Sequence, residues 1–83
     1  MSLQLLYFAR LKDAFGVSRE TLDSPASTVD QLLDQLRQRG AVWQDELDTK
    51  RVFRVAVNQT LATGETALAD GDEIAIFPPV TGG

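Results

Sequence analysis

The sequence contains neither cysteine nor histidine, and these two absences exclude most of the chemistry that an 83-residue chain could perform. Without cysteine there is no disulfide, no thiolate nucleophile and no zinc-thiolate site, and nothing indicates an oxidising compartment. Without histidine the chain lacks the commonest general base and the commonest ligand of transition metals. Only hydroxyl groups and two lysines remain as nucleophiles, with no imidazole to activate them. We therefore expect the chain to be non-catalytic alone.

Long apolar runs and an excess of basic residues are also missing. The opening MSLQLLYFAR has no basic leader and is interrupted at Gln4, so it does not resemble a signal peptide. No apolar run approaches the roughly 20 residues of a membrane span. Twelve acidic against eight basic residues give a net charge of -4, which argues against nucleic-acid binding. We expect a soluble, cytoplasmic protein with no membrane or nucleic-acid partner, and the acidic balance suits a basic protein partner.

What is present is enough apolar sequence for one small core, since 43% of the residues are hydrophobic. Alternation and β-branched residues predict strands in five stretches, which are residues 3–10, 17–23, 52–57, 60–62 and 73–77. The runs LKDAFG and VWQDELD predict two short helical segments, the first closed by Gly16. Strands before and after one principal helix indicate the α+β class, with a mixed sheet of about five strands.

The principal helix is predicted in TVDQLLDQLRQRG. Thr28 is in position to cap its N-terminus, with Gln31 three residues later in a capping-box arrangement. Gly40 is a natural residue for the left-handed position just after the helix. Its apolar residues, Val29, Leu32, Leu33 and Leu36, follow the helical period, so the helix should pack one stripe on one face of the sheet.

Two polar stretches could be taken for functional sites, but ordinary turn chemistry explains them better. DGDE, residues 70–73, places three carboxylates together, but the spacing fits no calcium loop, and a solvated turn is favoured. Asn58 in VNQT suits a tight turn that requires positive φ. The glycines before the C-terminus occur singly, with no phosphate-binding pattern. We expect no metal and no cofactor to be bound by this chain.

The first and last predicted strands carry more apolar side chains than one helix can cover. If Leu3, Leu5, Tyr7, Ile74 and Ile76 face the helix, alternation places Leu6, Phe8 and Phe77 on the opposite face. Exposed aromatic residues on an uncovered sheet face are typical of a protein interface. A loop folded over them, or an alternation misjudged by one residue, would explain the same pattern.

The ending FPPVTGG separates a folded unit, residues 1–77, from an expected flexible tail, residues 78–83. Pro78 and Pro79 cannot extend a central strand and favour an extended, stiff conformation. Val80 and Thr81 are small, and Gly82 and Gly83 let the backbone pass where a Cβ would clash. Six extended residues reach about 20 Å. The tail is therefore either a reactive end that threads into a partner or an inert, frayed end or cloning remnant.

DGDEIAIFPPVTGG, together with VAVNQTL and LLYFAR, resembles the small subunit of molybdopterin synthase over essentially the whole chain. Members of this family are sulfur carriers with the ubiquitin-like β-grasp fold. The terminal di-glycine alone is shared with ubiquitin, the thiamine-pathway carrier and related modifiers, whereas FPPVTGG is more specific. The alternatives that remain are a protein modifier that conjugates through Gly83, a sulfur carrier for thiamine synthesis or tRNA thiolation, and a non-covalent interaction domain.

The resemblance implies a specific chemistry for the end of the chain. A ubiquitin-activating-type enzyme would use ATP to adenylate the Gly83 carboxylate, which then becomes a thiocarboxylate. The tail would enter the large catalytic subunit, in a heterotetramer, and donate sulfur to a cyclic pyranopterin monophosphate during molybdenum cofactor synthesis. The family's partner-binding positions correspond to Phe8, Leu61 and Phe77 here; Leu61 is implied by the resemblance alone.

Overall fold

The computed structural model describes residues 1–79, which form one sheet of five strands and three helices. The strands are β1 (Ser2–Tyr7), β2 (Arg19–Asp23), β3 (Arg54–Val57), β4 (Thr60–Leu61) and β5 (Glu73–Phe77). The helices are α1 (Arg10–Phe15), α2 (Val29–Arg37) and α3 (Ala41–Glu46). None of these three helices is long and apolar enough to cross a membrane.

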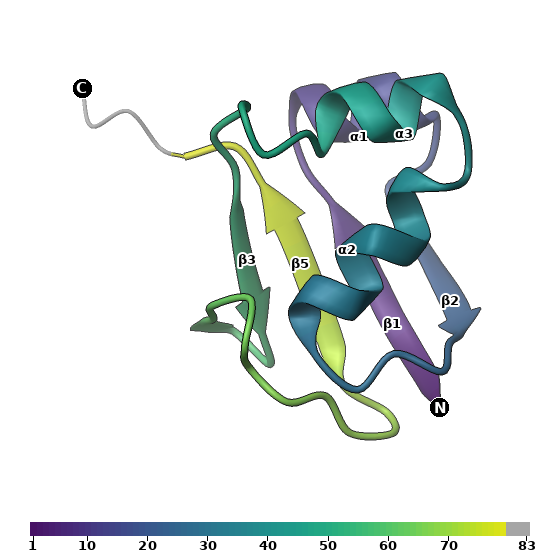
Figure 1. Cartoon of the computed structure of the whole chain (residues 1–83), viewed down its shortest axis with the longest axis vertical. Coiled ribbons are helices and arrows are strands. Elements are labelled where there is room, and N and C mark those ends of the chain that lie inside the picture. The colour runs from purple at the N-terminus through teal and green to yellow at the C-terminus, as the bar shows by residue number, and fades with distance from the viewer. Residues whose placement is uncertain (80–83) are drawn as a thin grey trace.

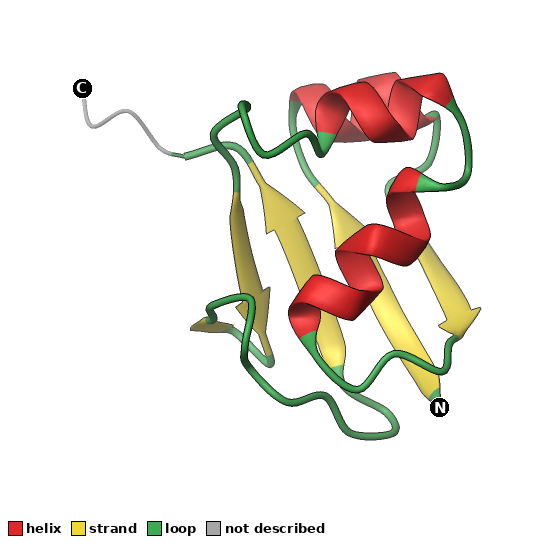
Figure 2. Cartoon of the chain, viewed as in Figure 1, coloured by secondary structure: helices red, strands yellow, loops and turns green. Residues whose placement is uncertain are grey.

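The sheet is mixed, with the strand order β2-β1-β5-β3-β4. The two central strands, β1 and β5, are parallel, and every other pair is antiparallel. Helix α2 crosses one face, while α1 and α3 lie at the end of the sheet where β1 and β5 finish (Figures 1 and 2). This is the predicted α+β class and the ubiquitin-like β-grasp architecture, with the two short helices grouped at one end.

The core lies between α2 and the sheet. Leu3, Leu5 and Tyr7 of β1, with Ile74 and Ile76 of β5, are at most 1% exposed. Parallel pairing sets Leu5 beside Ile74 and Tyr7 beside Ile76, so these side chains form one continuous surface beneath the helix. The predicted alternation is therefore confirmed for both central strands.

Helix α2 begins where the sequence predicts, but its caps differ in detail. The Thr28 hydroxyl accepts a hydrogen bond from the Gln31 amide at 3.3 Å, whereas the Gln31 side chain accepts from Ser27 rather than returning to Thr28. The expectation for Gly40 is wrong. The helix tightens into i–3 hydrogen bonds at Gln38 and Arg39, and Gly40, at φ 155°, is instead the residue from which α3 starts.

An aromatic and charged cluster fixes the end of β1. The Tyr7 hydroxyl donates to Glu20 at 2.7 Å, and Arg39 donates two hydrogen bonds to the same carboxylate at 2.7 and 2.8 Å. The Phe15 and Trp43 rings stack at 3.8 Å, and Tyr7 meets both edge-on. The Arg39 guanidinium holds the pKa of Glu20 below its ordinary value, while burial raises the pKa of Tyr7. The residue that follows Tyr7 is thereby held in place.

Candidate partner-binding face and tail

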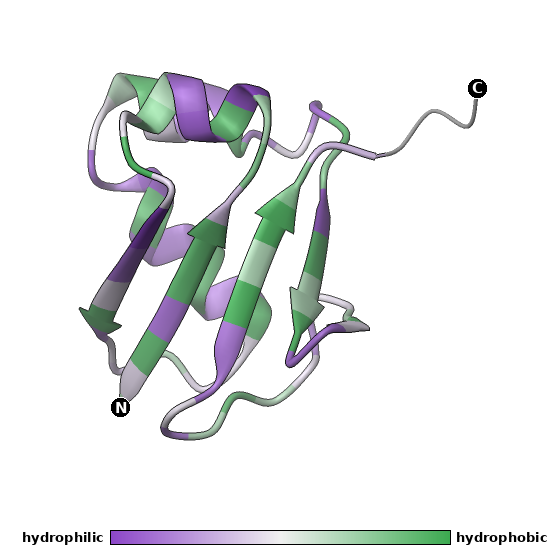
Figure 3. Ribbon diagram, turned by 180° about the vertical axis from the view of Figure 1, so that it is seen from behind, coloured by the Kyte–Doolittle hydropathy of each residue, from purple (hydrophilic) through white to green (hydrophobic). Residues whose placement is uncertain are grey.

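The face of the sheet opposite α2 is left open by residues 1–79. Figure 3, which views the molecule from behind, shows the strands in front of α2, while α1 and α3 lie at one end of the sheet. Alternation requires that β1 and β5 present to this side the residues that they do not present to the core. We call the apolar part of this surface the open-face patch; it consists of Leu6, Phe8, Ala56, Leu61, Ala75 and Phe77.

Strand register brings four members of the patch into one row. Leu6 of β1 lies opposite Ala75 of β5, Ala75 lies opposite Ala56 of β3, and Ala56 lies opposite Leu61 of β4. The two central positions are alanines, of which Ala75 is half-buried and Ala56 is buried, so the middle of the row lies low between its two higher ends. Such a surface can receive an apolar ridge from another protein, because small side chains leave room for close approach.

Phe8 and Phe77 lie one step further along the strands, toward the tail. The Phe8 amide donates to the Ile76 carbonyl at 3.3 Å, which extends the β1–β5 pairing up to Phe77. Phe8 is 46% exposed, Leu61 is 69% exposed and Phe77 is half-buried. The prediction that Phe8 and Phe77 occupy the uncovered face is confirmed, and no loop within residues 1–79 buries Phe8. Their role in binding a partner stays a prediction.

Backbone strain accompanies the exposed position of Phe8. Ala9, the next residue, has φ 53° and ψ -129°, a conformation that costs a residue with a Cβ about 1–3 kcal/mol. Leu11, two residues later, is fully buried. The sharp reversal at Ala9 therefore leaves Phe8 on the open face while α1 turns back to the core.

The predicted tail begins directly after the patch. Strand β5 ends at Phe77, as predicted, and Pro78 and Pro79 follow outside the sheet. Both prolines are half-buried. The other tail residues proposed from the sequence, Val80, Thr81, Gly82 and Gly83, lie outside the described residues. The division into a folded unit and a tail therefore stays a prediction beyond Pro79.

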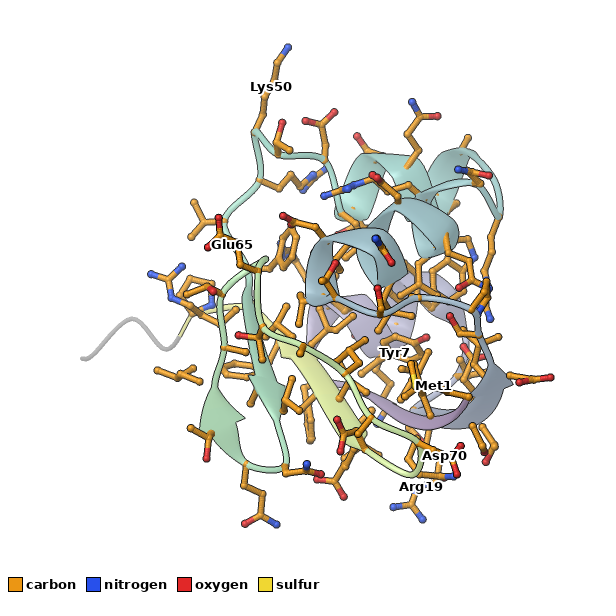
Figure 4. The ribbon with its side chains drawn as sticks, turned by 60° about the horizontal axis from the view of Figure 1, so that its bottom comes forward. Met1, Tyr7, Arg19, Lys50, Glu65 and Asp70 are labelled. Atoms are coloured by element: carbon orange, nitrogen blue, oxygen red, sulfur yellow. The ribbon has the colours of Figure 1, made fainter. Side chains whose placement is uncertain are left out.

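Two of the three carboxylates of DGDE, those of Asp70 and Asp72, have structural partners, as expected of a turn. Asp72 accepts hydrogen bonds from the Asn58 side chain at 2.9 Å and the Ala69 amide at 2.8 Å. The Asn58 hydrogen bond holds the pKa of Asp72 below its ordinary value. Asp70, near Met1 in Figure 4, accepts from the Ser2 amide at 2.6 Å. Within residues 1–79 no group of acidic side chains could hold a metal ion.

Sequence reasoning missed three residues of this face: Ala56, Ala75 and Arg54. Arg54 lies directly opposite Phe77 in the β3–β5 ladder and is exposed. The alternation within VFRVAV separates Arg54 and Ala56 from Val55 and Val57, so the two sides of this strand could have been distinguished. The pairing of β3 with β5, which decides the side that faces outward, has no such local signal.

Comparison with known proteins gives a consistent result. The profile of the ThiS family matches residues 5–83. The molybdopterin synthase sulfur carrier subunit of Haemophilus influenzae is 41% identical over 81 residues, covering 98% of this chain and 99% of that protein.

Two solved structures are similar over the full length of both chains. SAMP1 of Haloferax volcanii, a small archaeal modifier protein, matches with a TM-score of 0.76 and 29% identity. A protein–protein complex of subunits 1 and 2 of molybdopterin-converting factor from Helicobacter pylori contains a chain that matches with a TM-score of 0.71 and 27% identity.

Proposed function

The chain belongs to the ThiS family, and on this premise we propose that it is a sulfur carrier subunit of molybdopterin synthase, with the sulfur carried as a thiocarboxylate on Gly83. The observation that carries the proposal is the continuity between the open-face patch and the tail. Phe77 is both the last residue of β5 and a member of the patch, and Pro78 follows it without an intervening loop. One docking event would therefore place residues 78–83 at a fixed point on the partner.

The chemistry requires activation by another protein. A carboxylate is a poor acyl donor, so an adenylating enzyme of the ubiquitin-activating type would join the Gly83 carboxylate to the α-phosphate of ATP, releasing pyrophosphate. A sulfur nucleophile would then displace AMP and leave the thiocarboxylate. Gly82 and Gly83 have no Cβ, so they present the acyl carbon to both partners without steric hindrance. ATP is used by the activating partner and is not bound by this chain.

The large catalytic subunit would supply the residues that receive the sulfur. The tail would enter this subunit and give its sulfur to a cyclic pyranopterin monophosphate, with two transfers for each dithiolene formed. A protein with neither histidine nor cysteine can leave the catalytic side chains to its partner, because its own reactive group is the chain terminus. Phe8, Leu61 and Phe77 would hold the subunit while the transfer takes place.

The proposal is tested by the intact mass of the protein after incubation with its activating enzyme, ATP and a sulfur source. Replacement of one oxygen by sulfur at the single activated acyl group should raise the mass by about 16 Da. A variant that lacks Gly83 should fold with unchanged stability and show no increase, since the deletion removes the reactive terminus but no side chain. An unchanged mass of the full-length chain under conditions that charge a known carrier would refute the proposal.

Similarity to SAMP1 supports one alternative, a protein modifier that conjugates through Gly83. The two functions share the adenylation step and differ in the nucleophile that follows, which is sulfur in one and a lysine amine in the other. Digestion of cell extracts with a protease that leaves the Gly82–Gly83 remnant would distinguish them. Isopeptide-linked remnants on other proteins would favour the modifier, and their absence alongside a thiocarboxylate would favour the carrier.

A further inference from the structure

The charge distribution on the open face differs from that of the whole chain. Although acidic residues outnumber basic residues, only four of the eight basic side chains form ion pairs within residues 1–79. The paired residues are Arg10, Arg37, Arg39 and Arg51. The others are Lys12, Arg19, Lys50 and Arg54. Because carboxylates are in excess, their number does not explain why the latter four side chains form no ion pair within residues 1–79.

Arg54 has the position of greatest interest among them. It lies on the open face directly opposite Phe77, the last residue before the tail. Its guanidinium reaches only the neighbouring Phe53 carbonyl, at 3.4 Å. The acidic residue of β5 on the same face, Glu73, is four residues before Phe77, which is about 13 Å along the strand. Lys50, by contrast, extends away from the molecule at the tip of the α3–β3 loop (Figure 4).

Docking of an apolar partner surface on the patch would remove water from Arg54. A guanidinium remains charged under all ordinary conditions, and its burial without a counter-charge is unfavourable. A carboxylate on the partner would compensate, and the planar guanidinium can accept it with two parallel hydrogen bonds. A basic partner surface, which the net charge of -4 alone favours, would instead face Arg54 with like charge.

We propose that the surface of the large catalytic subunit that receives the open-face patch is apolar at its centre and acidic where it meets Arg54, beside the entry of the tail. This inference rests on the proposed function, because it assumes that the large subunit is the occupant of this face. It assigns to Arg54 the role of fixing the orientation of the docked carrier. Phe8, Leu61 and Phe77 would then supply the apolar contact area, and Arg54 would determine the register at which the tail enters.

The test measures the equilibrium dissociation constant of the full-length chain for its purified large subunit at low and high salt. Arg54→Glu should weaken association by about ten-fold or more at low salt, because like charges then meet at the interface. Arg54→Gln, which keeps most of the side chain, should weaken it less and reduce its salt dependence. Lys12→Glu on α1 is the matched control, since it makes the same charge change at an exposed residue that is not a member of the patch, and it should have little effect.

The possible outcomes separate the inference from the proposed function. If the wild-type chain binds and Arg54→Glu is no weaker than Lys12→Glu, the inference is wrong and the sulfur-carrier function stands. Tighter binding of Arg54→Glu would likewise overturn it, because the partner surface would then be basic. If the wild-type chain does not bind the large subunit at all, the proposed function itself fails. Circular dichroism of each variant confirms that the fold is intact, since Arg54 and Lys12 are both exposed.

Discussion

Leu61→Ala separates the stability of this protein from its association with a partner. Leu61 is 69% exposed in the two-residue strand β4, so its side chain adds little to the fold. Burial of a whole leucine side chain is worth about 1.5–3 kcal/mol, and about two-thirds of that remains to be gained on docking. Allowing for the methyl group that alanine keeps, truncation should cost about 1–1.5 kcal/mol of association, or about five- to twelve-fold in Kd.

Titration calorimetry with the large subunit measures this change, and urea unfolding measures stability in parallel. Val42→Ala is the matched control, because Val42 is 50% exposed on α3 and lies away from the open face. We expect Val42→Ala to leave Kd within about two-fold, and both variants to lose less than about 0.5 kcal/mol of unfolding free energy. Equal Kd values for the two variants would refute the placement of Leu61 in the interface, and a large stability loss would show that Leu61 packs within the fold.

Two further predictions concern the hydrogen-bonded cluster around Tyr7, which precedes Phe8, and the strained residue Ala9, which follows it. Glu20→Gln should lower the unfolding free energy by about 1 kcal/mol at pH 7, since Arg39 and Tyr7 lose a charged acceptor that is itself partly solvated. The pKa of Glu20 is lowered by folding, so its stabilisation is present above the ordinary pKa of 4.5 and is lost as the pH falls through the folded value. Urea unfolding at pH 7 and pH 3 should show the wild type and the variant converging at the lower pH, and a constant difference would contradict this. Ala9→Gly should raise the unfolding free energy by about 0.5–1 kcal/mol, because relief of the strained φ exceeds the entropy that glycine loses; a loss of stability in thermal unfolding would show that Ala9 is unstrained.

Much of the fold could be predicted from local patterns. The alternation of Leu3, Leu5 and Tyr7 and the β-branched run around Ile74 and Ile76 identify the core side of both central strands, because burial on one face has a period of two. The Thr28 cap likewise marks the start of α2 to the residue. These signals lie within a few residues of the feature that they predict.

Features that depend on the order of the strands in the sheet could not be predicted from local patterns. Arg54 and Leu61 join the open face only because β3 pairs with β5 on one side and β4 on the other, and no local pattern specifies that order. The expectation for Gly40 is wrong for a related reason. A glycine after a helix is compatible with a left-handed cap, but here the chain enters α3 at once, and the direction of that helix determines the backbone conformation.

Localisation of the sulfur within the chain tests the central claim most directly. Trypsin cleaves after Arg54, and no lysine or arginine follows it, so residues 55–83 are released as one peptide. After incubation with the activating enzyme, ATP and a sulfur source, tandem mass spectrometry should assign the gain of about 16 Da to the fragment that contains Gly83. Addition of the large subunit and its pterin substrate should remove this gain. A gain elsewhere in the chain, or one that persists in the presence of substrate and large subunit, would contradict the account.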